Sequence, residues 1–192
     1  MPTVFYLTHP QVLINPAIPV PHWGLSPIGR ARAEAAASAP WTQKVCRIVS
    51  STEVKAVETA AIFADARGLS VEPCADMHEN DRSATGFLPP PDFEATADAF
   101  FAHPDISIRG WERAIDAQTR IVSVVFTVLS QPSVGDTLIV GHGAVGTLLM
   151  THLLKVPISR TLDQPAGGGH VFAFDAKTHA VIHQWCDLQS LH

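Results

Sequence analysis

Apolar and polar positions along the 192-residue chain follow two different periods. Short apolar runs over 3–8, 45–49 and 136–140 predict buried strands. Near the end, 170–174 and 180–185 alternate between apolar and polar residues on either side of a short polar turn, which predicts a hairpin. Apolar residues at helical spacing fill most of the chain between these runs. Strands and helices that alternate in this way predict one α/β domain with a mixed sheet.

Several helix ends can be placed from single residues. Ser26 followed by Pro27 is typical of a helix start, and this helix is expected to stop before Pro40. A second helix follows the turn at 50–52 and is expected to end at Gly68. Two more are predicted, over 111–129 and from about 143 to 153.

Residues 72–109 do not fit the alternation of strands and helices. They contain a run of three prolines at 89–91 and a short aromatic segment at 93–101 that is expected to be helical. We interpret this stretch as an insertion that covers one end of the sheet. The chain has no internal repeat and no low-complexity linker, so residues 1–192 are expected to form a single domain.

Composition limits the class of protein. Hydrophobic residues make up 46% of the chain and charged residues 16%, and no stretch of eighteen apolar residues occurs, so no membrane partner is expected. Three widely spaced cysteines and the absence of a basic apolar leader favour a reducing, cytoplasmic location. A net charge of −5 argues against nucleic acid as a partner. A small anionic ligand would therefore need a local positive pocket.

Two histidines stand where apolar strands end. His9 closes the first predicted strand, and His142 follows the strand at 136–140. In an open α/β sheet, ligands bind beyond the carboxyl ends of the strands. The two imidazoles are therefore expected to face one small anion or one reacting centre. The simpler interpretation, that they are unrelated loop histidines, has to be weighed against the other motifs.

The segment from Gly141 to Gly146 matches a dinucleotide-binding glycine pattern, but the match is short. A dinucleotide site needs an acidic residue about twenty positions later at the end of a strand. Asp163 has this spacing but does not follow a strand-like run. The same glycines fit an anion site at a helix N-terminus, where Gly143 lets a phosphate approach the backbone N–H groups.

Four segments together resemble the histidine phosphatase superfamily, the phosphoglycerate-mutase-like enzymes. The family's Arg-His-Gly-Glu strand end, its Leu-Ser/Thr-x-x-Gly helix start, its Ser-Ser-x-x-x-Arg-Ala turn and its second His-Gly occur here in the same order. The matching residues are Thr8-His9-Pro10-Gln11 with Asn15, Leu25–Gly29, Ser50–Ala60 and His142-Gly143, and Glu79 most resembles the acidic residue of the insertion. The resemblance implies a three-layer α/β/α sandwich with a mixed, mainly parallel central sheet.

The resemblance also implies a role for each matching residue. His9 would be the nucleophile that holds the phosphoryl group, and Glu79 the proton donor, with Asp81 as the alternative carboxylate. His142, with the backbone of Gly143, would stabilise the transferring group. The expected phosphate-binding residues are Lys55, Thr8, Asn15, Gly143 and Arg82. No metal and no cofactor is implied, and the partner would be phosphate or a small phosphorylated molecule. Glu79 and Lys55 also have a simpler interpretation as solvated surface residues.

Departures from the family pattern leave two functions open. Thr8 and Lys55 stand where the family has arginines that grip phosphate in a bidentate fork, and Pro10 replaces a glycine. Arg82 and Arg160 are possible substitutes. We expect a phosphoric ester hydrolase that works through a phosphohistidine, or alternatively a catalytically impaired protein of this fold that binds a phosphorylated or other anionic ligand. Without the first arginine, His9 is expected to titrate near the usual histidine pKa of about 6.5.

Overall fold

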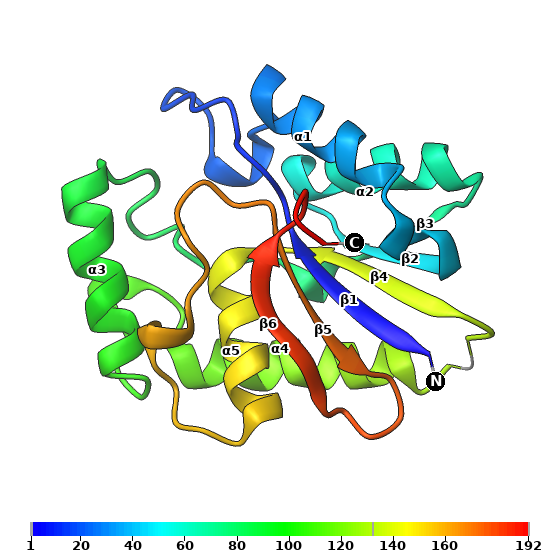
Figure 1. The fold of residues 1–192 in the computed structure, drawn as a ribbon. Helices are drawn as coiled ribbons and strands as arrows, with labels where there is room; N and C mark the ends of the chain where they lie inside the picture. The colour runs from blue at the N-terminus through cyan, green and yellow to red at the C-terminus, as the bar shows by residue number, and fades with distance from the viewer. Residues whose placement is uncertain (1, 132, 192) are drawn as a thin grey trace.

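A six-stranded sheet forms the centre of the molecule in the computed structural model, which describes residues 2–131 and 133–191 (Figure 1). The strand order is β3-β2-β4-β1-β5-β6. The first four strands in this order run parallel, whereas β5 is antiparallel to both β1 and β6. The sheet is mixed and mainly parallel, as predicted. Its strands are β1 (Thr3–Thr8), β2 (Val45–Ser51), β3 (Val71–Cys74), β4 (Asp136–Gly141), β5 (His170–Asp175) and β6 (Val181–Asp187).

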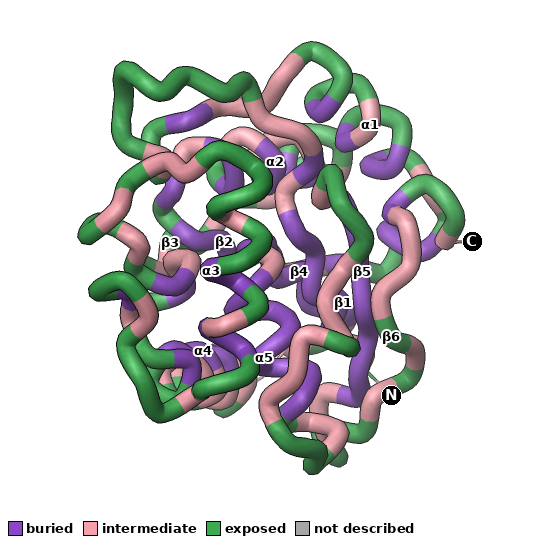
Figure 2. Tube along the Cα trace, turned by 90° about the vertical axis from the view of Figure 1, so that its left-hand side faces the viewer, coloured by how far each residue is buried: buried purple, intermediate pink, exposed green. Residues whose placement is uncertain are grey.

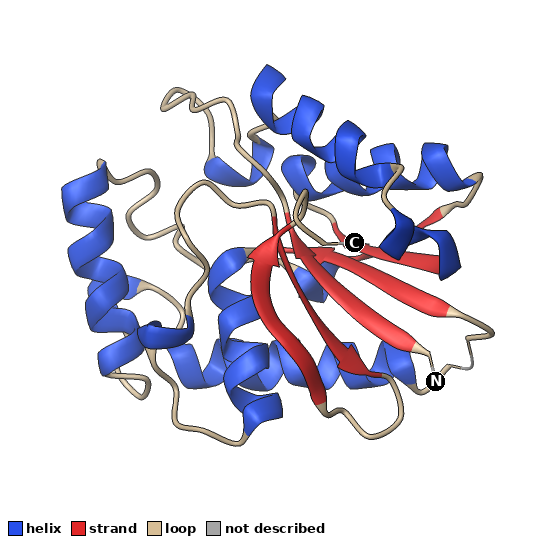
Figure 3. Ribbon diagram, in the orientation of Figure 1, coloured by secondary structure: helices blue, strands red, loops and turns tan. Residues whose placement is uncertain are grey.

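Helices cover both faces of this sheet and complete the three layers (Figure 3). Helices α1 (Pro27–Ala37) and α2 (Val54–Arg67) lie on one face, and α4 (Ala114–Leu129) and α5 (Gly143–Leu154) lie on the other. Helix α3 (Pro90–Ala102) stands beside the sheet. Five short 3₁₀ turns complete the described elements: η1 (Val20–His22), η2 (Pro40–Lys44), η3 (Ala75–Met77), η4 (Ile108–Gly110) and η5 (Arg160–Leu162).

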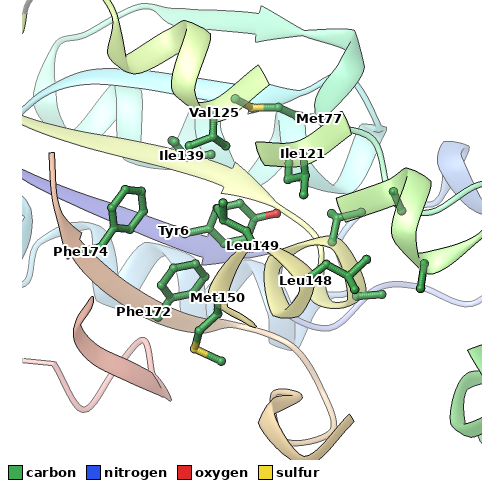
Figure 4. Packing of buried hydrophobic residues seen from close by; sticks show 14 of the residues in the cluster. Tyr6, Met77, Ile121, Val125, Ile139, Leu148, Leu149, Met150, Phe172 and Phe174 are labelled. Atoms are coloured by element: carbon green, nitrogen blue, oxygen red, sulfur yellow. The ribbon is translucent and has the colours of Figure 1, made fainter. Parts of the chain in front are cut away.

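Strand β1 illustrates why the apolar runs become central strands. Successive side chains of a strand point to opposite faces, so a strand covered on both sides needs a continuous apolar run. Tyr6 packs with α4 and α5 in one core, and Leu7 packs with α1 and α2 in the other. Figure 4 shows part of the first core, where Tyr6 of β1 lies beside Leu149 of α5 and Ile139 of β4 lies beside Val125 of α4.

The expected helix ends at Ser26 and Gly68 are confirmed. The Ser26 hydroxyl accepts a hydrogen bond from the backbone N–H of Gly29 at 3.1 Å, which caps α1. Gly68 ends α2 in the left-handed conformation, with φ at 64°. Helix α1 stops at Ala37, before Pro40, as the proline required.

Two sequence-based boundaries were wrong. Helix α4 begins at Ala114 and not at Trp111, because Trp111 is extended and buried against the aromatic rings of Phe93 and Phe100. The apolar side chain that looked like the first turn of a helix belongs to the core instead. The start of the supposed insertion is also a strand: β3 pairs with β2, and Pro73 is tolerated because β3 lies at the sheet edge.

The segments that follow β3 lie toward the end of the sheet where the parallel strands finish. Figure 2 looks onto this side: the inner strands β1, β2, β4 and β5 are mostly buried, while α3 and the loops around it are largely exposed. Loops at this edge are where ligands of open α/β sheets bind. In the described part of the chain, none of the helices has both the length and the apolar character that crossing a membrane requires.

Candidate active site

His9 and His142 meet because the strands that carry them are neighbours. Thr8 of β1 pairs with Gly141 of β4, and the two strands run parallel. The backbone N–H of His9 continues this ladder by donating to the Gly141 carbonyl at 3.2 Å. The two imidazole rings lie 5.4 Å apart, centroid to centroid, with a 64° angle between their planes. Two residues 133 positions apart in the chain thus form one centre.

The ring of His9 is held with one nitrogen free. Its Nδ1 lies 2.9 Å from the Pro10 carbonyl oxygen, so the neutral ring carries its proton there and keeps the lone pair on Nε2. Burial, reinforced by the nearby His142, lowers the pKa of His9 to about 3. The expectation that His9 titrates near 6.5 was therefore wrong: loss of an arginine matters less than removal of the ring from water.

His142 is fully buried beside His9. Its Nε2 lies 2.8 Å from the Ser51 hydroxyl, which itself accepts from the backbone N–H of Glu53. When the Ser51 hydroxyl donates to Nε2, the proton of a neutral His142 stands on Nδ1; the Glu53 carboxylate, 3.6 Å from Nε2, favours the other tautomer. That Nδ1 has no hydrogen-bond partner among residues 2–131 and 133–191. Burial lowers the pKa of His142, against the opposing effect of the Glu53 carboxylate.

Lys55 is buried and paired with a carboxylate that the sequence analysis overlooked. Its ammonium donates to the Glu53 carboxylate and, at 3.0 Å, to the Val20 carbonyl. An ammonium has three N–H donors, so one remains for a ligand. Burial alone would raise the pKa of Glu53, but the imidazole of His142, the ammonium of Lys55 and a backbone N–H lower it to about 2.

Glu79 caps the helix that follows His142. Its carboxylate oxygens accept hydrogen bonds from the backbone N–H groups of Ala144 and Val145, both at 3.1 Å. The N-cap residue His142 makes no side-chain cap of its own. The carboxylate therefore occupies a position at the start of α5 where an anion is favoured. Burial opposes ionisation of Glu79, but Arg82, His142 and the backbone N–H groups of Asn80 and Ala144 hold its pKa below the usual value.

Arg82 and Asn80 complete the polar part of the site. The Arg82 guanidinium lies 3.4 Å from the Glu79 carboxylate and donates to the Asn80 side-chain oxygen at 2.8 Å. It also stacks over the rings of Phe93 and Trp111, which fixes its plane. The Nδ2 of Asn80 is buried and has no hydrogen-bond partner in the described part of the chain. A buried donor without a partner is a natural contact for a ligand.

These side chains open into one cavity of about 660 Å³, a volume suited to a small molecule. The structure brings together five of the residues singled out from the sequence, namely His9, His142, Glu79, Lys55 and Arg82, and also the alternative carboxylate Asp81. The cavity is lined by His9, Val12, Pro16–Pro21, Trp23, Glu53, Lys55, Glu79–Ser83, Gly86, Phe87 and His142.

Three of the expected phosphate-binding residues do not line the cavity. The Thr8 hydroxyl is buried and donates to the side-chain oxygen of Gln164 at 2.6 Å. The exposed Asn15 closes a turn by accepting from the Ala17 N–H at 3.1 Å. Gly143 starts α5, and the Gln164 amide lies against it so closely that a Cβ there would be 2.4 Å from Nε2.

Asp81 and Arg160 fit the site less well than Glu79 and Arg82. The Asp81 side chain is exposed and accepts from the Ser83 N–H at 2.8 Å, a bond that lowers its pKa. Arg160 pairs with the carboxylates of Glu94 and Asp98 on α3 and does not reach the cavity.

Of the two cavity residues that were missed, one has a local signal in the sequence. Glu53 stands two positions before Lys55 at the start of a helix, where an acidic residue favours the macrodipole. Asn80 follows Glu79 directly, but nothing in its local sequence indicates burial. Across residues 2–131 and 133–191, no group of three histidine, cysteine or acidic side chains is arranged to hold a metal ion.

Comparison with known proteins identifies the family. A family model described as the histidine phosphatase superfamily (branch 1) matches residues 19–187. The chain belongs to the histidine phosphatase superfamily. The matched region contains Glu79 and His142 but begins after β1, so it does not include His9. No curated protein matches the chain.

Several solved structures share the fold at low sequence identity. The YhfR protein of Bacillus stearothermophilus is 20% identical with a TM-score of 0.80, over 96% of this chain and 95% of that one. A mycobacterial glucosyl-3-phosphoglycerate phosphatase is 21% identical with a TM-score of 0.75, over 96% of both chains. The phosphoserine phosphatase of Entamoeba histolytica, solved with 3-phosphoglyceric acid, is 16% identical with a TM-score of 0.78, over 100% of both. These similarities establish the phosphoglycerate-mutase-like fold predicted from the sequence.

Proposed function

We propose that the protein hydrolyses a small phosphomonoester by transferring its phosphoryl group to His9 and then to water. The observation that carries this proposal is the Nε2 of His9: it is the free nitrogen of a neutral imidazole, and it faces a cavity with unpaired donors. Membership of a phosphatase superfamily supports the reaction class. Structural neighbours solved with phosphate or 3-phosphoglyceric acid support a small phosphorylated substrate.

In the first step, Nε2 of His9 attacks phosphorus and the bond to the ester oxygen breaks. In the tautomer with its proton on Nδ1, His142 donates to the phosphoryl oxygens, together with Nδ2 of Asn80 and the remaining N–H of Lys55. These three donors take the part of the arginine fork that the family pattern would supply. In the second step, water attacks the phosphohistidine, and the N–P bond breaks to release phosphate.

Glu79 is the proposed proton donor, but its lowered pKa keeps it ionised near neutral pH. A phosphoryl group near α5 brings negative charge close to the Glu79 carboxylate and raises its pKa. It also competes for the N–H groups that hold this carboxylate. The protonated Glu79 then gives its proton to the departing alcohol and recovers one from the attacking water. Asp81 is the weaker candidate because its side chain is exposed and bonded within its own loop.

A binding protein that has lost the chemistry is the second candidate. Its supporting observation is that both cations lining the cavity, Lys55 and Arg82, already have carboxylate partners. A phosphate that arrives in this cavity meets a weaker positive potential than a bidentate arginine pair would give. Such a protein would bind its ligand but form no covalent intermediate.

Phosphoenzyme trapping separates the two candidates. Acetyl phosphate is a suitable donor because its leaving group is small and needs no protonation. Incubation is expected to give an acid-labile, base-stable phosphoenzyme, detected by intact mass, which His9→Ala abolishes. His142→Ala is expected to slow its formation by about a hundredfold or more, as for one lost transition-state contact. His103→Ala, a loop histidine outside the cavity, serves as the control. Equal labelling of the wild type and the His9→Ala variant would leave the binding protein as the better description.

A further inference from the structure

Much of the cavity wall is apolar. It is built mainly by the proline-rich loop at 16–21, together with Trp23 and Phe87. The rings of Trp23 and Phe87 lie 5.4 Å apart at an angle of 55°. The indole N–H of Trp23 donates to the carbonyls of Asn15 and Ile18, at 2.9 and 3.2 Å. The polar atom of Trp23 is thus satisfied within the loop, and the ring itself is left for apolar contact.

The charges of the cavity leave nothing to bind a second anionic group. Three carboxylates line it, from Glu53, Glu79 and Asp81, against two cations, Lys55 and Arg82. The ammonium of Lys55 is paired with Glu53, and the guanidinium of Arg82 lies 3.4 Å from Glu79. Among the described residues that line the cavity, no cation is without a carboxylate partner. A carboxylate carried by the substrate would lose its water and gain no counter-ion, which is costly.

We propose that the substrate is a phosphomonoester of an uncharged, apolar alcohol or phenol, with its ring or branched chain against Trp23 and Phe87. This inference rests on the proposed function, because it places the phosphoryl group at His9 and the remainder of the ester along the apolar wall. It excludes esters whose alcohol carries a carboxylate. The rings of Trp23 and Phe87 provide contact area for the apolar part of the ester. The charge balance of the cavity discriminates against esters whose alcohol carries a carboxylate.

Binding of two non-hydrolysable phosphonates tests the inference without requiring turnover. Benzylphosphonate and 4-carboxybenzylphosphonate differ only in a carboxylate far from phosphorus, and calorimetry measures the Kd of each. Benzylphosphonate is expected to bind at least about tenfold more tightly, because the added carboxylate finds no partner in the cavity. Equal affinity, or tighter binding of the carboxylated compound, would overturn the inference. Absence of a phosphoenzyme in the trapping experiment would instead count against the proposed function.

Variants at Phe87 show whether the apolar wall makes the difference. Phe87→Ala is expected to weaken benzylphosphonate binding about tenfold and to leave methylphosphonate, which has no ring, unchanged. The exposed Ile28 on α1 lies outside the cavity, so Ile28→Ala should change neither Kd. Phe87→Arg adds an unpaired cation and is expected to reverse the preference toward 4-carboxybenzylphosphonate. The inference is wrong if Phe87→Ala weakens the binding of benzylphosphonate and methylphosphonate equally. It is also wrong if Phe87→Arg still binds benzylphosphonate more tightly than 4-carboxybenzylphosphonate, because the ligand then does not lie against this wall.

Discussion

At the scale of single residues, the protonation of His9 is decided by burial. Its pKa of about 3 lies well below the usual 6.5, so the ring stays neutral through the whole range around neutrality. A neutral imidazole is the form that attacks phosphorus. Phosphoenzyme formation should therefore continue at constant rate as the pH falls through 6.5. The test is the rate of phosphoenzyme formation from acetyl phosphate, measured against pH. A fall in this rate with its midpoint near pH 6.5 would show that His9 is accessible to water.

The lowered pKa of His9 also makes the free energy of unfolding depend on pH. Between about pH 3 and 6.5, the unfolded chain binds a proton on His9 that the folded protein does not. The free energy of unfolding therefore falls as the pH drops through this window. The slope of this free energy against pH corresponds to the uptake of at most about one proton on unfolding. His9→Gln is expected to remove this part of the slope in urea titrations. His22→Gln, at an exposed position of the η1 turn, is the matched control for the substitution itself.

The Glu53–Lys55 pair controls how much positive charge the cavity offers. Glu53→Gln keeps a hydrogen-bond acceptor but removes the negative charge beside Lys55. Inorganic phosphate should then bind about tenfold more tightly, since a nearby unit charge is worth on the order of 1–3 kcal/mol at these distances. Stability should fall by about 1–3 kcal/mol, because the buried ammonium loses its ionic partner.

Two measurements check this prediction: the Kd for phosphate by calorimetry and the free energy of unfolding in urea. Glu72→Gln is the control, because Glu72 pairs with Arg47 at 2.7 Å on the sheet edge, outside the cavity. An unchanged phosphate Kd in Glu53→Gln would mean that the ammonium of Lys55 does not reach the ligand.

At the scale of elements, helix α5 depends on a cap from a distant part of the chain. Glu79 lies more than sixty residues before the N–H groups that it binds, and the helix has no side-chain cap from its own N-cap residue. Glu79→Ala is expected to lower the free energy of unfolding by about 1 kcal/mol, as for the loss of an N-cap. Saturating phosphate should restore part of this loss by binding the exposed N–H groups.

Urea unfolding with and without phosphate measures both effects. Glu94→Ala removes a carboxylate that pairs with Arg160 away from the cavity, and phosphate should not change its stability relative to the wild type. If Glu79→Ala is as stable as the wild type, the carboxylate is not a structural cap and its position at α5 has to be explained by function alone.

At the scale of the whole molecule, the missing family arginine is accounted for by a contact across the fold. The Thr8 hydroxyl at the end of β1 holds Gln164, and the Gln164 amide lies against Gly143 at the start of α5. An arginine at position 8 would have to occupy the space of this amide. Thr8→Arg alone should therefore bind phosphate no better than the wild type, because the guanidinium meets Gln164.

The double variant Thr8→Arg/Gln164→Ala frees that space and should bind phosphate about tenfold more tightly or better, as expected for a charge-assisted contact. Gln164→Ala alone is the control and should not gain affinity. Phosphate Kd values for the four proteins form a double-mutant cycle. Additive effects of the two substitutions would contradict the idea that Gln164 occupies the space that an arginine at position 8 would need.

The sequence by itself determined the elements and the edge of the sheet at which the site forms. Strands buried on both faces need continuous apolar runs, and helix ends follow from Ser26, Gly68 and the prolines, so these features are visible locally. The ends of the first and fourth strands located His9 and His142. The local pattern of apolar residues gave a wrong helix start at Trp111, because the spacing of this core side chain matches that of the helix that follows. It also missed β3, because this short edge strand has little apolar periodicity.

Only the tertiary structure decided which residues contact one another in the site. The contacts that set its charge and protonation join residues far apart in the chain: Glu79 to α5, the Glu53 carboxylate to the backbone of Glu79, and Thr8 to Gln164 across 156 positions. Such partners are chosen by strand order and loop packing, which a local period does not encode. The pKa of His9 is also decided by the tertiary structure, because desolvation depends on everything that surrounds the ring and not on its neighbours in sequence.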